Sequence, residues 1–186
     1  MRTLKAWIYM TLDGVVEAPE TWVIPDAEMF AAQTAGYGTS DALLLGRRTY
    51  EVFAASWPQR GSDVQNADWM NTTRKYLAST TLAAPSWRNT TVLQGDVVQA
   101  VAGLKREDGK DITVNGSAGL LRTLLRAELV DVLQLYVHPL LVGSGSRLFD
   151  DAPDRVGLTL RDVRRFDSGI VALSYSSADT MRGEIR

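Results

Sequence analysis

Short apolar runs alternate with stretches of helical periodicity along the first two thirds of the chain. A short apolar run between turn residues indicates a buried strand, whereas apolar residues at i, i+3, i+4 and i+7 indicate one face of a helix. Such alternation predicts βαβ units, with a largely parallel sheet and helices on both of its faces. The predicted strands are Leu4–Met10, Ala42–Leu45, Tyr76–Ser79, Thr91–Leu93 and Ile112–Val114. The predicted helices are Asp26–Tyr37, Arg47–Ser56, Asp68–Arg74, Asp96–Leu104 and Ala118–Arg126.

The last third of the chain has a different pattern. Val130–Val142 is a long strand-like run, while Leu158–Phe166 and Ile170–Ser176 flank Asp167–Gly169, a turn signal that predicts a hairpin. We therefore expect the sheet to end in antiparallel strands. No linker or repeat interrupts the pattern, so the prediction is one α/β sandwich domain over residues 1–178 and a polar tail at 179–186.

Composition narrows the class of protein without identifying a function. A chain of 186 residues suits one domain with a sizeable core, and a net charge of −2 without a basic run gives no sign of a nucleic-acid partner. The absence of cysteine excludes disulfides, thiolate zinc sites and cysteine nucleophiles. No apolar run approaches the roughly 20 residues of a membrane helix, and the first residues do not resemble a secretory signal. We expect a cytoplasmic protein with no membrane segment and no metal site.

The chain contains one histidine, His138, within the strand-like run Leu135–Val142. A hydrolytic triad or a histidine-rich metal site would depend on this single ring. A packed or hydrogen-bonded strand histidine is the simpler interpretation, and we prefer it.

The stretch Leu43–Phe53 predicts a strand, a tight turn at Gly46 and a helix that begins with two arginines. Arg47 and Arg48 stand at the positive end of the helix dipole, where each cation is unfavourable by about 0.3–1 kcal/mol. A bound anion would reverse the sign of this interaction, since free backbone N–H groups and both guanidinium groups would face it. Two solvated surface arginines are the alternative.

Two further junctions between strands and the segments after them carry small or hydroxylated residues. Ile112–Val114 leads into the glycine-containing stretch Asn115–Leu120, and the strand at Tyr76 ends in Ser79–Thr81. Either stretch can simply form a turn. In a parallel sheet, however, the carboxyl ends of strands lie at one edge, which is where such folds bind ligands. A cationic helix start and a glycine-rich one at the same edge suit a cofactor that contains a diphosphate.

The first predicted strand ends at Asp13-Gly14 and opens into a long loop that contains Trp22. Such a loop can cover a bound ring. The helix after the loop begins with Asp26 and Glu28, carboxylates that suit a first helical turn. The alternative is a carboxylate at the wall of a pocket, where it would bond a polar heterocycle.

These stretches, together with Leu129–Asp131 and Pro139–Gly145, occur in an order that resembles the dihydrofolate-reductase-like superfamily. The closest similarity is to stand-alone bacterial proteins that resemble the reductase domain of the riboflavin-biosynthesis deaminase/reductase. The resemblance implies a three-layer sandwich, a central mixed sheet of about eight strands and an antiparallel C-terminal hairpin. It also implies a homodimer and NADPH as the cofactor.

The resemblance further implies roles for particular residues. Arg47 and Arg48 would supply charge to the NADPH phosphates, and Gly46 and Thr49 would place backbone groups beside them. Ser79 and Thr80 would lie at the 2′-phosphate end, and Asp13 and Gly14 would lie near the nicotinamide. The diphosphate would be held by Asn115, Gly116, Ser117, Ala118, Gly119 and Leu120.

The function that the resemblance implies is NADPH-dependent reduction of a small heterocyclic or carbonyl compound. The substrate would resemble 5-amino-6-(5-phosphoribosylamino)uracil or dihydrofolate. Asp26 is the predicted catalytic carboxylate. The predicted substrate contacts are Trp22, Glu28, Tyr50 and Trp57. A non-catalytic NADP-binding or sensor protein on the same fold is the alternative.

Overall fold

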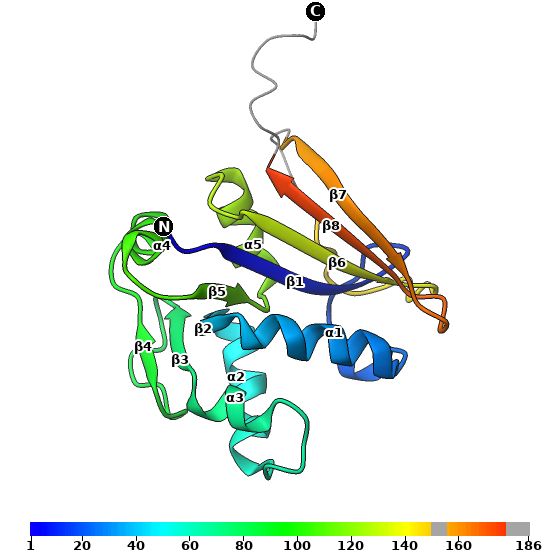
Figure 1. The fold of residues 1–186 in the computed structure, drawn as a ribbon. Coiled ribbons are helices and arrows are strands. Elements are labelled where there is room, and N and C mark those ends of the chain that lie inside the picture. The colour runs from blue at the N-terminus through cyan, green and yellow to red at the C-terminus, as the bar shows by residue number, and fades with distance from the viewer. Residues whose placement is uncertain (150–155, 178–186) are drawn as a thin grey trace, which may run out of the picture.

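The computed structural model describes residues 1–149 and 156–177, and within them eight strands form one mixed sheet (Figure 1). The strand order is β4-β3-β2-β5-β1-β6-β8-β7. Neighbours from β4 to β6 pair in parallel, whereas β8 is antiparallel to both β6 and β7. The strands are β1 (Leu4–Thr11), β2 (Ser40–Gly46), β3 (Arg74–Ala78), β4 (Thr90–Val92), β5 (Asp111–Val114), β6 (Val132–His138), β7 (Leu158–Arg165) and β8 (Val171–Ser177).

Helices cover both faces of the sheet. Each strand of an α/β sandwich presents alternate side chains to its two faces, and here these form two separate apolar clusters. Residues of α1, α2 and α3 belong to one cluster, and residues of α4 and α5 belong to the other. The helices are α1 (Ala27–Gly38), α2 (Arg47–Ser56), α3 (Ala67–Thr72), α4 (Val97–Arg106) and α5 (Ala118–Arg126), with 3₁₀ turns η1 (Pro19–Thr21) and η2 (Trp57–Gln59). The predicted three-layer sandwich with an antiparallel C-terminal hairpin is confirmed.

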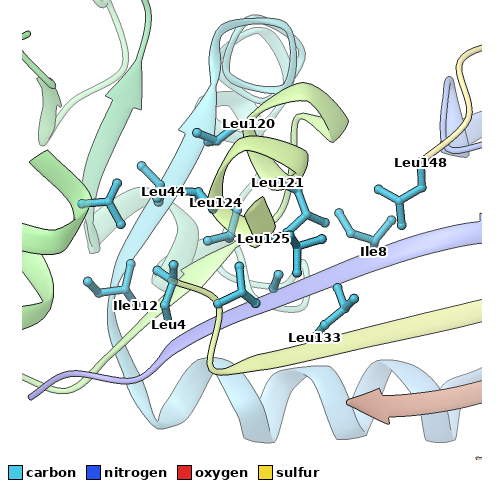
Figure 2. Close-up of a cluster of buried hydrophobic side chains, with 14 of the residues drawn as sticks. Leu4, Ile8, Leu44, Ile112, Leu120, Leu121, Leu124, Leu125, Leu133 and Leu148 are labelled. Carbon is cyan, nitrogen blue, oxygen red and sulfur yellow. The ribbon is translucent and has the colours of Figure 1, made fainter. Parts of the chain in front are cut away.

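The α5 side of the core is built mainly from leucine. Leu120, Leu121, Leu124 and Leu125 are all buried, since their spacing places them on one stripe of α5. Figure 2 shows these four side chains facing branched aliphatic residues of the strands beneath them, Leu44 of β2 among them. This packing fixes the start of α5 against the carboxyl end of the sheet.

The structure corrects two predicted boundaries. The long run Val130–Val142 forms a strand only over Val132–His138, because Pro139 has no N–H to continue the ladder and the Leu140 N–H turns back to the His138 carbonyl. The helix predicted over Asp68–Arg74 ends at Thr72, and Arg74 already belongs to β3. The tail predicted at 179–186 lies outside the described residues.

The contact between α1 and the sheet depends on Gly36. A Cβ atom at this position would lie 2.2 Å from the Trp7 ring, whereas a Cβ on Gly38, in the same helix, would meet nothing within 4 Å. We expect Gly36→Ala to lower the free energy of unfolding by about 1–3 kcal/mol, as overpacking does. Gly38→Ala is the matched control and should be neutral or stabilising by up to about 1 kcal/mol. Urea unfolding of both variants measures the difference, and equal stabilities would contradict this account of the packing.

Candidate functional site

Three strand-end junctions that the sequence singles out meet at one open hollow of about 310 Å³. They meet because β2, β3 and β5 run parallel, so that all three strands end at the same edge of the sheet. The hollow is lined by Gly46, Arg47, Ala78, Ser79, Thr80, Thr81, Leu93, Gly95, Val97, Ser117, Gly119, Leu120 and Thr123. The predicted cofactor residues that do not line it are Asp13, Gly14, Arg48, Thr49, Asn115, Gly116 and Ala118.

Two glycines bring the starts of α2 and α5 together. The Gly46 N–H donates to the Gly116 carbonyl at 3.0 Å, and a Cβ on Gly46 would lie 2.4 Å from Ser117 Oγ. Gly116 has a φ of +115°, and a Cβ there would lie 2.8 Å from Thr49 Oγ1. Only glycine fits at these two positions, so the two helix starts share one wall of the hollow.

Hydrogen-bond donors converge on the hollow. Arg47 is exposed, and its Nη1 lies 3.2 Å from Thr81 Oγ1 across the opening. The first N–H groups of a helix have no intrahelical acceptor, and no side chain caps the start of α2 to accept from them. Gly119, in the first turn of α5, faces open space. A guanidinium group, hydroxyls and helix N-termini together have the chemistry of an anion-binding site.

The two adjacent arginines point to different places. Arg47 lines the hollow, and its Nε lies 3.9 Å from Oε1 of Glu51 on the same helix. Arg48 is exposed and lies near the segment after β1, where it acts on Glu17. The Ser146 N–H and, to a smaller extent, the charge of Arg48 lower the pKa of the Glu17 carboxyl. From the sequence, both arginines are expected to face the same anion. In the structure, Arg47 lines the hollow and Arg48 does not.

Asp13 joins two loops that are far apart in sequence. We call residues 11–17 and 140–148 the clasp, because they bond to each other at the carboxyl ends of β1 and β6. Asp13 accepts from the Thr11 hydroxyl at 2.5 Å and from the Gly143 N–H at 2.7 Å, and these bonds lower its pKa to about 2. The clasp also includes a bond from the Leu148 N–H to the Gly14 carbonyl. Placement of Asp13 and Gly14 near a nicotinamide stays a prediction.

The carboxylates at the start of α1 have structural partners. Asp26 is the N-cap and accepts the Met29 N–H at 2.8 Å. The nearby Ser168 hydroxyl and this N–H lower the pKa of Asp26, so the group is ionised at neutral pH. Glu28 forms an ion pair with Arg164 of β7. An ionised capping carboxylate is a poor proton donor, and the catalytic role of Asp26 stays a prediction without support from this geometry.

The aromatic residues predicted to contact substrate divide into two groups. Tyr50 lies in the core, where it is only 2% exposed and its hydroxyl accepts the Trp87 N–H at 2.9 Å, so its contact with substrate stays a prediction without support from this geometry. Trp57 follows the last residue of α2, about 15 Å along the helix from Arg47, where Arg60 stacks on its ring. Trp22 does lie at the edge that carries the hollow's strand ends, with its ring edge against His138 of β6.

Sequence reasoning missed a fourth junction at the hollow. Leu93, Gly95 and Val97 line it from the connection between β4 and α4. The available signal was the sequence Gly95-Asp96, a glycine with a φ of +72° followed by an N-cap aspartate. Sequence reasoning also missed buried polar pairs beneath α1: Tyr9 donates to Gln33 at 2.7 Å, and Asn115 donates to Tyr37 at 2.6 Å.

Comparison with known proteins identifies the family. The profile of the RibD C-terminal domain matches residues 2–172. The chain belongs to the RibD C-terminal domain family. One relative is YyaP of Bacillus subtilis, an uncharacterised protein. It is 30% identical to this chain over 172 residues, which cover 89% of this chain and 90% of YyaP. The resemblance proposed from the sequence motifs is therefore confirmed.

Solved structures of low sequence identity share the fold of this family member. A Shewanella sp. protein that is provisionally assigned to riboflavin biosynthesis superposes with a TM-score of 0.75 at 16% identity, over 94% of this chain and 98% of its own. The riboflavin biosynthesis reductase Rib7 of Saccharomyces cerevisiae gives 0.63 at 15% identity, over 95% and 90%. Identities this low show the fold alone.

Other predictions are not tested by the fold of the family. Among residues 1–149 and 156–177, no helix is long and apolar enough to cross a membrane, and no three potential ligands group as a metal site. The homodimer and the cytoplasmic location stay predictions.

The lowered pKa of Asp13 predicts how the stability of the protein depends on pH. A carboxyl group whose pKa is lower in the folded state stabilises the protein above its ordinary value of 3.8 and loses that effect as the pH falls through about 2. We expect Asp13→Asn to lower the Tm at neutral pH, with a difference from the native protein that shrinks over this interval. Asp108→Asn, at an exposed position between α4 and β5, is the control and should change neither the Tm at neutral pH nor its dependence on pH. A Tm difference for Asp13→Asn that is constant with pH would contradict the role given to this carboxylate.

Proposed function

We propose that the protein is an NADPH-dependent reductase of a small heterocyclic or carbonyl compound. The hollow between the starts of α2 and α5 carries this proposal, because an exposed arginine, three consecutive hydroxyl residues, the uncapped start of α2 and the first turn of α5 converge there. Two phosphate groups fit such a set of donors better than a single carboxylate does. Membership of a reductase-like family supports an oxidoreductase.

The residues at the hollow fit a dinucleotide cofactor. Arg47 and Ser79–Thr81 would hold the adenosine 2′-phosphate, and the first turn of α5 would hold the diphosphate. The space in front of Gly119 admits a phosphate close to the helix backbone. When bound, NADPH supplies the hydride, and the protein contributes binding, orientation and exclusion of water.

The substrate of the proposed reaction is less defined than the cofactor. The resemblance to the riboflavin-biosynthesis reductase domain favours a ribosylaminopyrimidine such as 5-amino-6-(5-phosphoribosylamino)uracil, and the wider superfamily favours a pteridine. The family relationship to a reductase domain supports a planar, polar heterocycle in either case.

A second candidate function is a non-catalytic NADP-binding or sensor protein. One observation favours it: Asp26, the predicted catalytic carboxylate, caps a helix, and Glu28, a predicted substrate contact, forms an ion pair. Oxidation of NADPH in the presence of pteridines, quinones or aldehydes separates the two candidates.

The proposal predicts different roles for the two adjacent arginines. Arg47→Ala should weaken NADPH binding about ten- to hundredfold, the loss expected for charge-assisted hydrogen bonds, and should weaken NADH binding much less. Arg48→Ala is the matched control and should keep the preference for NADPH, since Arg48 does not line the hollow. Calorimetric titration of both cofactors measures this. An equal loss of NADPH and NADH on Arg47→Ala would contradict the assignment of the 2′-phosphate.

A second prediction concerns a substitution that places a side chain inside the hollow. A side chain at Gly119 would meet no protein atom within 4 Å and would project into the hollow. We expect Gly119→Glu to fold normally and to lose NADPH binding by about tenfold or more, because it adds a negative charge opposite the phosphates. Gly103→Glu is the control, since Gly103 of α4 also faces open space but does not line the hollow. Unchanged NADPH binding by Gly119→Glu, measured with the same titration, would place the cofactor elsewhere.

A further inference from the structure

His138 is the single histidine of the chain, and it lies at the carboxyl end of β6. It pairs in register with Thr11 of β1 and is fully buried. β6 is the third strand from β2 in the sheet order, so His138 lies about 14 Å from Gly46 across the strands at about 4.8 Å per strand. The strand registers place it a further three residues, about 10 Å, along the strand direction. A cofactor that is anchored by its phosphates in the hollow would extend along this edge toward the imidazole.

The bonds of the imidazole define its tautomer. The Ile24 N–H donates to His138 Nδ1 at 3.3 Å, so Nδ1 carries a lone pair. Burial lowers the pKa of His138 below its ordinary value, which keeps the ring neutral at neutral pH. A neutral imidazole that accepts at Nδ1 carries its proton on Nε2. His138 therefore presents a neutral N–H donor at Nε2.

This donor has no partner in the described part of the chain. His138 Nε2 is buried and makes no hydrogen bond within residues 1–149 and 156–177. Its neighbours are aromatic: the Tyr9 ring lies 5.6 Å away and the Trp22 ring 5.4 Å away, centroid to centroid, both in edge-on contact. A buried N–H without an acceptor is unfavourable and uncommon, so a native structure that keeps one has a reason to do so.

The segment that contains Trp22 and Ile24 contacts His138 and is held by a few local hydrogen bonds. Trp22 Nε1 donates to the Glu17 carbonyl at 2.7 Å, and the Val23 N–H donates to the Pro19 carbonyl at 2.8 Å. The clasp fixes the preceding residues separately, through the bond from the Val16 N–H to the Ser146 carbonyl. A shift of the Trp22 side chain breaks its bond to the Glu17 carbonyl but leaves the sheet and the bonds between the two loops of the clasp in place.

We propose that His138 donates its Nε2–H to a ring carbonyl or ring nitrogen of the hydride acceptor, with Trp22 as the movable aromatic cover. The inference rests on the proposed reductase function and assigns a substrate contact to a residue that the sequence interpretation treated as structural. A neutral donor between two aromatic rings favours an uncharged, planar heterocycle over an anionic substrate.

The test uses the native protein, since a single histidine gives a single imidazole spectrum. Protein labelled with ¹⁵N-histidine is saturated with NADP⁺ and titrated with 5,6-diaminouracil, a planar ring with two carbonyl groups. We expect the Nε2–H tautomer before titration, and a shift of the Nε2 and Hε2 resonances that saturates as the heterocycle binds. An Nδ1–H tautomer, a cationic ring, or resonances that do not move at saturating heterocycle would overturn the inference, with N–H···π contact to Trp22 as the remaining explanation.

Two variants of His138 distinguish the role of Nε2 as a donor from the role of Nδ1 as an acceptor. His138→Gln keeps an N–H donor near the position of Nε2, whereas His138→Asn keeps an acceptor near Nδ1 for Ile24 but has no donor at Nε2. We expect His138→Asn to bind 5,6-diaminouracil about tenfold more weakly, and His138→Gln to retain more of the affinity. Equal affinities in both variants and the native protein would count against the inference. NADPH binding by the native protein, measured in parallel, separates failure of the proposed function from failure of the His138 inference. If the native protein does not bind NADPH, both proposals are overturned. If it binds NADPH but the imidazole resonances do not move, only the His138 inference is overturned.

Discussion

The close approach of Gly46 to Gly116 and Ser117 is the constraint on which the candidate site depends. Parallel pairing of β2 with β5 brings the ends of these strands side by side, and the absence of a Cβ on Gly46 lets Ser117 occupy the space between them. The start of α5 then stands beside the start of α2, and their backbone donors face one hollow. A larger residue at either glycine would separate the two helix starts and divide the site.

Carboxylates near this edge of the sheet hold the backbone in place. Asp13 and Glu17 accept N–H groups from the loop 140–148, and Asp26 accepts one from the first turn of α1. Each bond lowers the pKa of its carboxyl group and keeps it ionised. Because these groups are committed to structure, the neutral donor His138 and the cation Arg47 are the better-placed groups for recognition of a ligand.

The sequence predicted much of the fold because its signals are local. The alternation of apolar runs, the acidic helix start at Asp26 and the turn at Asp167–Gly169 each depend on neighbouring residues, and the structure agrees with them. The partners of single side chains were less predictable. Asp13 bonds to Gly143 across 130 positions, and Tyr50 shares the helical stripe of Trp57 yet is buried beside Trp87. No periodicity distinguishes a carboxylate that faces a ligand from one that bonds a distant loop.

A crystal structure of the protein with NADP⁺ would show whether the hollow between α2 and α5 binds the phosphates of the cofactor. We expect the adenosine 2′-phosphate within hydrogen-bonding distance of Arg47 and the hydroxyls of Ser79–Thr81. The diphosphate should lie at the start of α5, and the nicotinamide should point toward the end of β6. Density for NADP⁺ at another place on the protein, or a hollow without phosphate when the cofactor is saturating, would contradict this assignment.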